Sequence, residues 1–325
     1  MNLHEHKEDF QNLVTLTSDH LGIPEVFIEK DYWVTYILYN LHHSDVSEEV
    51  VFKGGTSLSK AHKLIDRFSE DVDLVIMNPS QRSQRSNNSF LKTVQKKIAI
   101  SPLEAITPST DNKEGRGYRQ RVFKYNKLNE KNSDYGHARD DLLLELNFFA
   151  TPSPISRLPI QTYINDFLNI DAKDAIKEFG LEPFELNILC TTRTFFEKVL
   201  SLYRNAHKSN ELLIGKIRHF YDIYMLVTKD TKVKAILSDK SKLESEIKRV
   251  IEDELAHETF CDIKEFLPLH QSSFSLNIAD NKEKLNKVYN DEFVSLIYRS
   301  DDLPSFDEVY SVMESLNSFI KEKNI

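Results

Sequence analysis

One continuous stretch limits the possible folds of this chain more than any other: KGGTSLSKAHKLIDRFSEDVDL, which begins at Lys53. Its pattern predicts a short strand that ends at Lys53, a tight turn, a helix over about 58–64 and a second strand over 72–77. The unit is therefore a strand, a turn, a helix and a strand. It predicts a domain in which helices and strands are mixed.

The turn in this unit has the composition of a phosphate-binding turn. Gly54 and Gly55 have no Cβ, so the backbone can turn sharply and bring its N–H groups close to another molecule. Thr56 and Ser57 place hydroxyls at the start of the helix, and a helix start favours an anion such as phosphate. The same residue types also occur in tight turns that bind nothing, so the turn alone leaves both interpretations open.

Two aspartates in the second strand predict a cation site. Asp71 and Asp73 are separated by one residue, so both carboxylates point to one side of the strand. Two like charges this close need a cation, and a hard divalent ion such as Mg²⁺ or Mn²⁺ suits oxygen ligands and keeps room for phosphates. Glu145, in the expected strand LLLELNFF, is the candidate third ligand. The alternative is that all three acids lie on solvated faces or in turns.

The pattern along the chain changes once, near its middle. A helix is expected over 24–41, with Pro24 at its first position, and strands over 118–128 and 142–149. Residues 151–166 contain three prolines and are expected to be an irregular connection. Beyond Cys190 helices are expected over 192–206, 212–228, 242–255, 282–298 and 305–323. The expected fold class is α+β, with a mixed sheet in an N-terminal domain followed by a helical bundle domain.

Composition excludes several classes of protein. Hydrophobic residues make up 40% and charged residues 29% of the 325 residues, with only 8 glycines, which excludes disordered and collagen-like chains. The two cysteines, Cys190 and Cys261, suggest neither a disulfide framework nor a zinc site. No apolar run approaches the roughly 20 residues that span a bilayer, and the polar, acidic N-terminus is unlike a signal peptide. We therefore expect a cytoplasmic protein without a membrane partner.

Charge is unevenly distributed along the chain. The net charge is −9, yet the segment 82–131 has 12 lysines and arginines against 4 aspartates and glutamates. This segment could track the phosphates of an RNA, with Tyr118, Phe123 and Tyr125 available to stack on a base. The alternative is a solvated, charged surface, which the count alone favours.

The motifs together resemble a known family. GGTSLSK followed by RFSEDVDL is similar to the signature of the nucleotidyltransferase superfamily with the polymerase-beta fold, and the EKDYW segment at 29–33 adds a resemblance to the AbiEii/AbiGii toxin group. The resemblance extends from Glu29 to Leu226 and implies a nucleotidyltransferase domain over 1–188 and a helical domain over 189–325. In the helical part it implies site roles for Lys198, Arg218 and Asp222.

The resemblance implies a metal-dependent transfer of a nucleoside monophosphate from a nucleoside triphosphate (NTP) to a hydroxyl, with release of pyrophosphate. The implied metal ligands, also catalytic, are Asp71, Asp73 and Glu145. The implied nucleotide contacts are Gly54, Gly55, Thr56, Ser57, Lys198 and Arg218. Lys198 would neutralise the leaving pyrophosphate, and Asp222 would orient these groups.

Ordinary structural roles remain open for several of these residues. Lys198 shares a helix face with Phe195 and Leu202, where its stem can cover apolar surface. Arg218 and Asp222, four residues apart, can form an intrahelical ion pair. Arg67 is expected to pair with Glu70 or to reach phosphate.

The acceptor is less constrained than the chemistry. The resemblance implies an RNA acceptor such as a tRNA end, growth inhibition as the toxin of a toxin–antitoxin or phage-defence system, and an antitoxin as partner. One alternative is a transferase that modifies a small molecule or a protein. Another is a nucleotide-binding module that acts on a partner without turnover.

Overall fold

The computed structural model describes residues 1–69, 71–115, 117–128, 139–256, 262–298 and 303–325. Contacts between Cα atoms divide the chain into two compact units, Met1–Leu189 and Cys190–Ile325. The first unit contains the sheet, and the described residues of the second form helices and no strand. The predicted α+β fold class, a mixed sheet followed by a helical bundle, is confirmed. The assignment of residues 1–188 as the nucleotidyltransferase domain stays a prediction.

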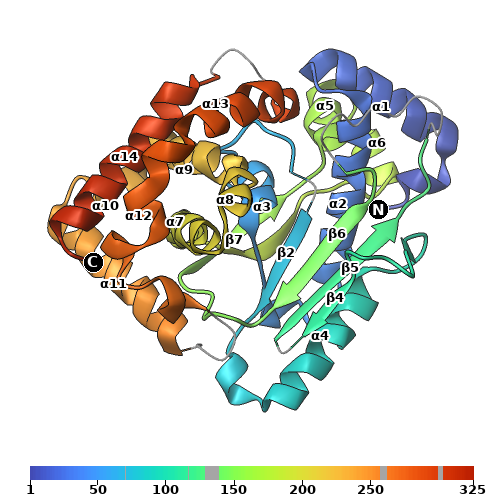
Figure 1. Cartoon of the computed structure of the whole chain (residues 1–325). Coiled ribbons are helices and arrows are strands. Elements are labelled where there is room, and N and C mark those ends of the chain that lie inside the picture. Colours follow the sequence, from blue (N-terminus) through green and yellow to red (C-terminus); the bar gives the residue numbers. More distant parts are fainter. Residues whose placement is uncertain (70, 116, 129–138, 257–261, 299–302) are drawn as a thin grey trace. The chain divides into compact units, whose positions relative to one another are not determined.

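The first unit is built around a mixed sheet with the strand order β3-β5-β6-β2-β1-β8-β7, and β4 pairs with β5 (Figure 1). Strand β2 runs antiparallel to β1 and parallel to β6, which places it near the middle of the sheet. The strands are β1 (Val50–Lys53), β2 (Asp71–Ile76), β3 (Glu104–Ala105), β4 (Lys113–Gly115), β5 (Tyr118–Lys124), β6 (Leu142–Asn147), β7 (Ile155–Ile160) and β8 (Phe184–Leu189).

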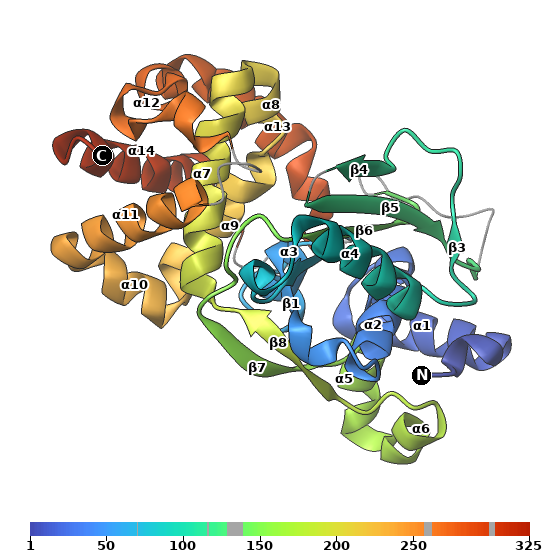
Figure 2. The same cartoon turned by 90° about the horizontal axis from the view of Figure 1, so that it is seen from below.

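Helices cover one face of this sheet. Helices α2 and α4 pack on each other and contact strands of the sheet (Figure 2). Arg119 of β5 donates to Gln95 of α4, and Arg119 is paired with Leu146, so α4 lies on the face of Leu146, opposite that of Glu145. The helices of this unit are α1 (Lys7–Leu21), α2 (Glu25–His42), α3 (Gly54–Lys60), α4 (Gln84–Ile98), α5 (Tyr163–Asp171) and α6 (Lys173–Glu178).

The second unit is a helical bundle in which α9 packs against both α7 and α14. A buried polar cluster ties three of its helices: Asn317 accepts hydrogen bonds from Tyr203 (3.1 Å) and Ser275 (2.5 Å). The helices are α7 (Thr191–Lys208), α8 (Asn210–Ile214), α9 (Ile217–Lys229), α10 (Thr231–Leu237), α11 (Lys240–Ala256), α12 (Ser273–Asn277), α13 (Lys282–Asp291) and α14 (Phe306–Glu322). None of the described helices is both long and apolar enough to cross a membrane.

Residues 151–166 are not the irregular connection that their prolines predicted. They contain β7 and the start of α5. Strand β7 lies at the end of the strand order, and an edge strand tolerates Pro159 because a ladder hydrogen bond is not required on its open side. Thr162 then begins α5 as its N-cap, accepting a hydrogen bond from the N–H of Asn165 at 2.9 Å.

Several expected helix boundaries were also wrong. Helix α3 begins at Gly54, not near residue 58. The helix expected over 212–228 is two helices, α8 and α9, which separate at Gly215. The helix expected over 282–298 ends at Asp291, and Pro24 is the N-cap of α2 rather than its first residue. The capping box of Ser305 and Glu308 at the start of α14 is confirmed.

Candidate active site

The register of the sheet brings the three candidate metal ligands to one face. Asp73 of β2 is paired directly with Glu145 of β6. Paired residues on neighbouring strands point to the same side, and the strands lie about 4.8 Å apart. Asp71 is two residues before Asp73 and shares its face. Lys53 is paired with Asp73 and Gln120 with Glu145, so a row of four polar side chains crosses the sheet.

The chemistry of this face suits a divalent cation. Three half-buried carboxylates on two adjacent strands offer the oxygen ligands that Mg²⁺ prefers. The side chains have not converged on a single point, since no group of three His, Cys, Asp or Glu side chains in the described part of the chain is arranged to hold a metal ion. The backbone register, with Asp71, Asp73 and Glu145 on one face of adjacent strands, therefore fits a metal site.

Tyr118 belongs to this face, although the sequence suggested only a stacking role for it. Its hydroxyl lies 3.0 Å from a carboxylate oxygen of Glu145 and within hydrogen-bonding distance of Gln120. Its ring stacks on Phe149, with centroids 5.7 Å apart. Burial, followed by the negative charges of Glu145, Asp73 and Asp71, raises the pKa of Tyr118. Only the antiparallel pairing of β5 with β6 reveals this position.

The glycine turn packs directly against the acidic face. Gly54 has φ +78°, and a Cβ at this position would lie 2.0 Å from Oδ2 of Asp73. A Cβ on Gly55 would lie 2.6 Å from Nη2 of Arg67 and 3.0 Å from Oγ of Ser69. Both glycines are therefore needed for close approach of the turn. Glu70, the partner expected for Arg67, lies outside the described residues.

Thr56 and Ser57 hold the turn from inside. Both are buried. The Thr56 hydroxyl lies 2.5 Å from the backbone oxygen of Asp71 and 2.9 Å from the hydroxyl of Ser69, which ties the turn to the start of β2. The Ser57 hydroxyl donates to the backbone oxygen of Gly54 at 2.9 Å. In this structure their hydroxyls stabilise the turn, and contact with a nucleotide stays a prediction.

In the helical unit, Lys198 and Asp222 form a buried ion pair. Lys198 Nζ lies 2.7 Å from Asp222 Oδ2, and Asp222 is fully buried. The pair joins α7 to α9, whereas the sequence suggested that Asp222 pairs within its own helix with Arg218. Arg218 is half-buried one helical turn before Asp222. A buried ion pair adds little net stability, because both charges lose their hydration. Stability of the fold is therefore a weak reason for the presence of this pair.

In the described part of the basic segment, two of the three aromatic residues do not offer the stacking surface that the sequence suggested. Phe123 and Tyr125 are buried, with 3% and 5% of their surface exposed. Many of its cations are already paired, and Glu114 alone contacts Lys92, Arg119 and Arg121 at 2.6 to 2.8 Å. Arg116 and the residues 129–131 of this segment lie outside the described part.

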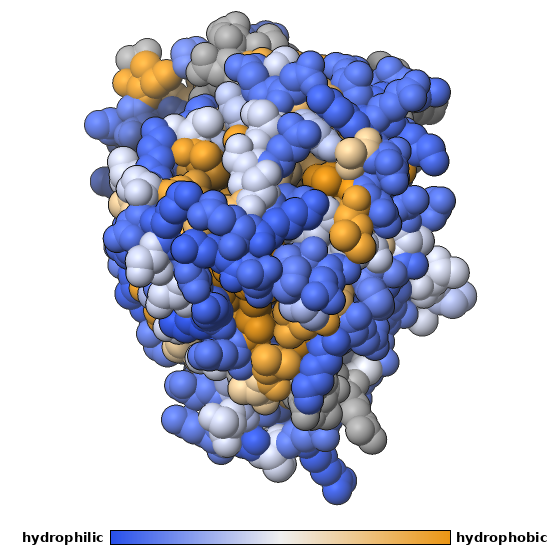
Figure 3. Space-filling model, turned by 60° about the vertical axis from the view of Figure 1, so that its left-hand side comes forward, coloured by the Kyte–Doolittle hydropathy of each residue, from blue (hydrophilic) through white to orange (hydrophobic). Residues whose placement is uncertain are grey.

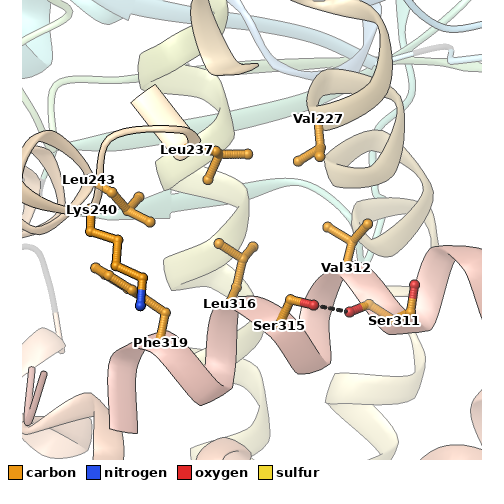
Figure 4. A pocket seen from close by; sticks show the side chains of 9 residues that line it. All are labelled: Val227, Leu237, Lys240, Leu243, Ser311, Val312, Ser315, Leu316 and Phe319. Carbon is orange, nitrogen blue, oxygen red and sulfur yellow. Dashed lines mark hydrogen bonds between the residues drawn. The ribbon is translucent and has the colours of Figure 1, made fainter. Parts of the chain in front are cut away.

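A pocket of about 300 Å³ in the helical unit has a different character. It lies between α9, α10, α11 and α14, and its walls are mainly Leu237, Leu243, Leu316 and Phe319, with Lys240 at one side (Figure 4). It has no carboxylate in its lining and so offers no metal ligand. On the face of the molecule that Figure 3 shows, hydrophobic side chains reach the surface between hydrophilic ones, as in most folded proteins.

Comparison with known proteins agrees with the motifs. The family model of the AbiEii nucleotidyl transferase toxins of type IV toxin–antitoxin systems matches residues 36–312. The chain belongs to this family. The resemblance drawn from GGTSLSK, RFSEDVDL and the helical residues is therefore confirmed, and the AbiEii-type chain is a nucleotidyltransferase. Membership also implies an NTP substrate and a cognate antitoxin.

Among solved structures, MenT4, a nucleotidyltransferase toxin from Mycobacterium tuberculosis H37Rv, is similar over 67% of this chain and 72% of its own, with 16% sequence identity and a TM-score of 0.40. No curated protein matches the chain.

Proposed function

We propose that this AbiEii-family toxin transfers a nucleoside monophosphate from an NTP to a hydroxyl at an RNA end, with Mg²⁺ or Mn²⁺ as cofactor. The observation that carries the proposal is the register of Asp73 opposite Glu145, with Asp71 on the same face and the Gly54 turn against Asp73. We place the reaction in the cytoplasm, where NTP and RNA are both abundant, and we propose that the resulting growth inhibition serves phage defence.

The proposed reaction is a single displacement at the α-phosphorus. The acceptor hydroxyl oxygen forms a bond to that phosphorus, the bond between the phosphorus and the oxygen that bridges to the β-phosphate breaks, and pyrophosphate leaves. The hydroxyl proton is lost to water. A bound divalent ion supplies charge stabilisation for the attacking and leaving oxygens.

The residues of the chain bind and orient the reactants. Asp71, Asp73 and Glu145 would hold the metal, and the Tyr118 hydroxyl keeps Glu145 oriented. Gly54 and Gly55 let the turn lie against Asp73 and Arg67, where it would bind the triphosphate, and Thr56 and Ser57 keep that turn in place. In residues 189–325, which we propose as a helical domain, Lys198 would bind the leaving pyrophosphate, with Asp222 orienting its amine. Arg218 is a further nucleotide contact.

The proposal of an RNA acceptor rests on the exposed cations of the basic segment. Arg85 and Lys96 of α4 are exposed and face solvent, and such side chains can contact a phosphate backbone. A tRNA end is the acceptor we test first.

The test uses each of four α-³²P-labelled NTPs, Mg²⁺ and total cellular RNA. Label in a tRNA-sized band with wild type, lost in Asp73→Asn and Glu145→Gln, is the expected result. Glu185→Gln, which changes an exposed carboxylate on β8 of the same sheet, is the matched control and retains transfer. Label in a protein or a small molecule instead of RNA would show that the acceptor is not RNA. NTP binding without any transfer would favour a nucleotide-binding protein without turnover over a transferase.

A further inference from the structure

Three consecutive charged residues of α2 are buried without a part in the proposed chemistry. Glu29, Lys30 and Asp31 expose only 5%, 0% and 5% of their surface. Charged residues are rarely this buried unless they are paired. Each one is tied to a different segment of the first unit, so their contacts indicate what they organise.

Asp31 joins three helices. One of its carboxylate oxygens pairs with Nζ of Lys60, the last residue of α3. The other accepts a hydrogen bond from the backbone N–H of Tyr163, the first residue of α5, at 2.9 Å. Nζ of Lys60 also lies 5.6 Å from the centroid of the Tyr163 ring. Helices α2, α3 and α5 therefore meet at one buried ion pair.

Stability alone is a weak reason for this pair. Burial lowers the pKa of Lys60, which reflects the cost of removing its charge from water. Apolar side chains of similar volume often stabilise a fold as well as a buried ion pair does, but they do not impose one geometry. The pair instead fixes the direction of Lys60 and with it the end of α3.

The position of α3 matters for the candidate active site. Its first two residues, Gly54 and Gly55, form the turn against Asp73 and Arg67. Its other end is Lys60, which lies six residues after Gly54 and is held by Asp31. Lys30 adds a second tie: its Nζ donates to the backbone oxygen of Arg139, just before β6, the strand that carries Glu145.

We infer that Asp31 and Lys60 are positioning residues for nucleotide binding: their buried ion pair holds α3 so that the Gly54–Gly55 turn meets the triphosphate beside Asp73. This inference rests on the proposed function. It predicts that loss of the pair weakens NTP binding more than the chemical step. Misplacement of a binding group by about 1 Å can cost up to roughly a hundredfold in rate.

The experiment compares Asp31→Asn, Lys60→Met and the double variant with wild type. For each, Kd for a non-hydrolysable NTP analogue with Mg²⁺, KM for NTP, kcat and Tm are measured. We expect each single variant to lower Tm and to raise Kd and KM about tenfold or more, with a smaller change in kcat. In the double variant Tm recovers, because no buried charge is left unpaired, while KM stays high.

Asp253→Asn is the matched control, since Asp253 pairs with the buried Arg193 in the second unit at 2.7 Å. It lowers Tm and leaves KM unchanged. Two outcomes would overturn the inference. One is a double variant in which KM returns to the wild-type value together with Tm, and the other is a set of folded single variants with unchanged KM. Failure of wild type to bind the NTP analogue would instead overturn the proposed function.

Discussion

Gly54 is the residue at which backbone geometry and chemistry meet most closely. A non-glycine residue at φ +78° costs about 1–2 kcal/mol. In Gly54→Ala the new methyl group would also lie 2.0 Å from Oδ2 of Asp73, so either the turn or the carboxylate must move. We expect nucleotide transfer by Gly54→Ala to fall about a hundredfold or more, measured as kcat/KM, with the protein still folded.

Gly115→Ala is the control for that substitution, because a Cβ at Gly115 meets no atom within 4 Å. If both alanine variants kept wild-type kcat/KM, close packing of the turn against Asp73 would have no role in transfer.

Glu29 gives the fold a pH dependence. Burial, opposed by a hydrogen bond from the N–H of Leu128, raises the pKa of Glu29 to about 7. In the folded state Glu29 therefore keeps its proton at a pH where Glu29 of the unfolded chain has lost it. The contribution of Glu29 to the free energy of unfolding is fully present below about pH 4.5 and is lost as the pH rises through 7. The shift corresponds to about 3 kcal/mol at most.

Glu29→Gln removes this dependence while keeping an oxygen that can accept from Leu128. We expect the variant to be more stable than wild type at pH 8 and similar to it at pH 5, as measured by urea denaturation. Glu8→Gln, an exposed carboxylate on α1, should follow wild type at both values. A Glu29→Gln variant less stable than wild type at pH 8 would contradict the assignment.

At the scale of elements, the helical unit depends on a buried polar contact among α7, α12 and α14. Asn317 accepts from Tyr203 and Ser275, and its amide lies 3.3 Å from the backbone oxygen of Ser275. Asn317→Ala leaves these buried groups unsatisfied, and we expect a loss of about 2–4 kcal/mol in the free energy of unfolding. Ser318→Ala, at the exposed neighbouring position, should change it by less than about 0.5 kcal/mol.

The elements also show what the sequence could and could not predict. Period-2 alternation placed Asp71 and Asp73 on one face of β2, because successive strand side chains alternate. It could not give the register of Asp73 with Glu145, since parallel pairing of strands distant in sequence depends on tertiary packing.

The largest errors in the predicted secondary structure occurred at glycine and proline residues. The apolar stripe of Leu213, Ile217 and Phe220 continues across Gly215, so periodicity predicted one helix where the chain forms two. The prolines of 151–166 led to the prediction of an irregular connection instead of β7. That prediction was wrong because an edge strand can contain a proline. For the site, Tyr118 and the Lys60–Asp31 pair were missed because both depend on contacts between segments distant in sequence.

At the scale of the whole molecule, charge limits how RNA could be bound. The net charge is −9, and many cations of the basic segment are paired with nearby acids. Glu114 is the centre of one such group: hydrogen bonding from Lys92, with Arg119 close by, holds the pKa of Glu114 at about 2. Non-specific affinity for a polyanion requires uncompensated cations, because it arises from release of counterions.

We therefore expect the wild-type protein to pass through a heparin column at about 0.15 M salt, where charges beyond roughly 8 Å are screened. Glu114→Gln removes the shared partner of three cations and should increase retention. Glu185→Gln changes the net charge equally but lies on β8, away from this group, and should increase retention less. Equal retention of the two variants would mean that net charge alone governs polyanion binding. A larger effect of Glu114→Gln would mean that polyanion binding depends on where the cations lie, which the proposed RNA acceptor requires.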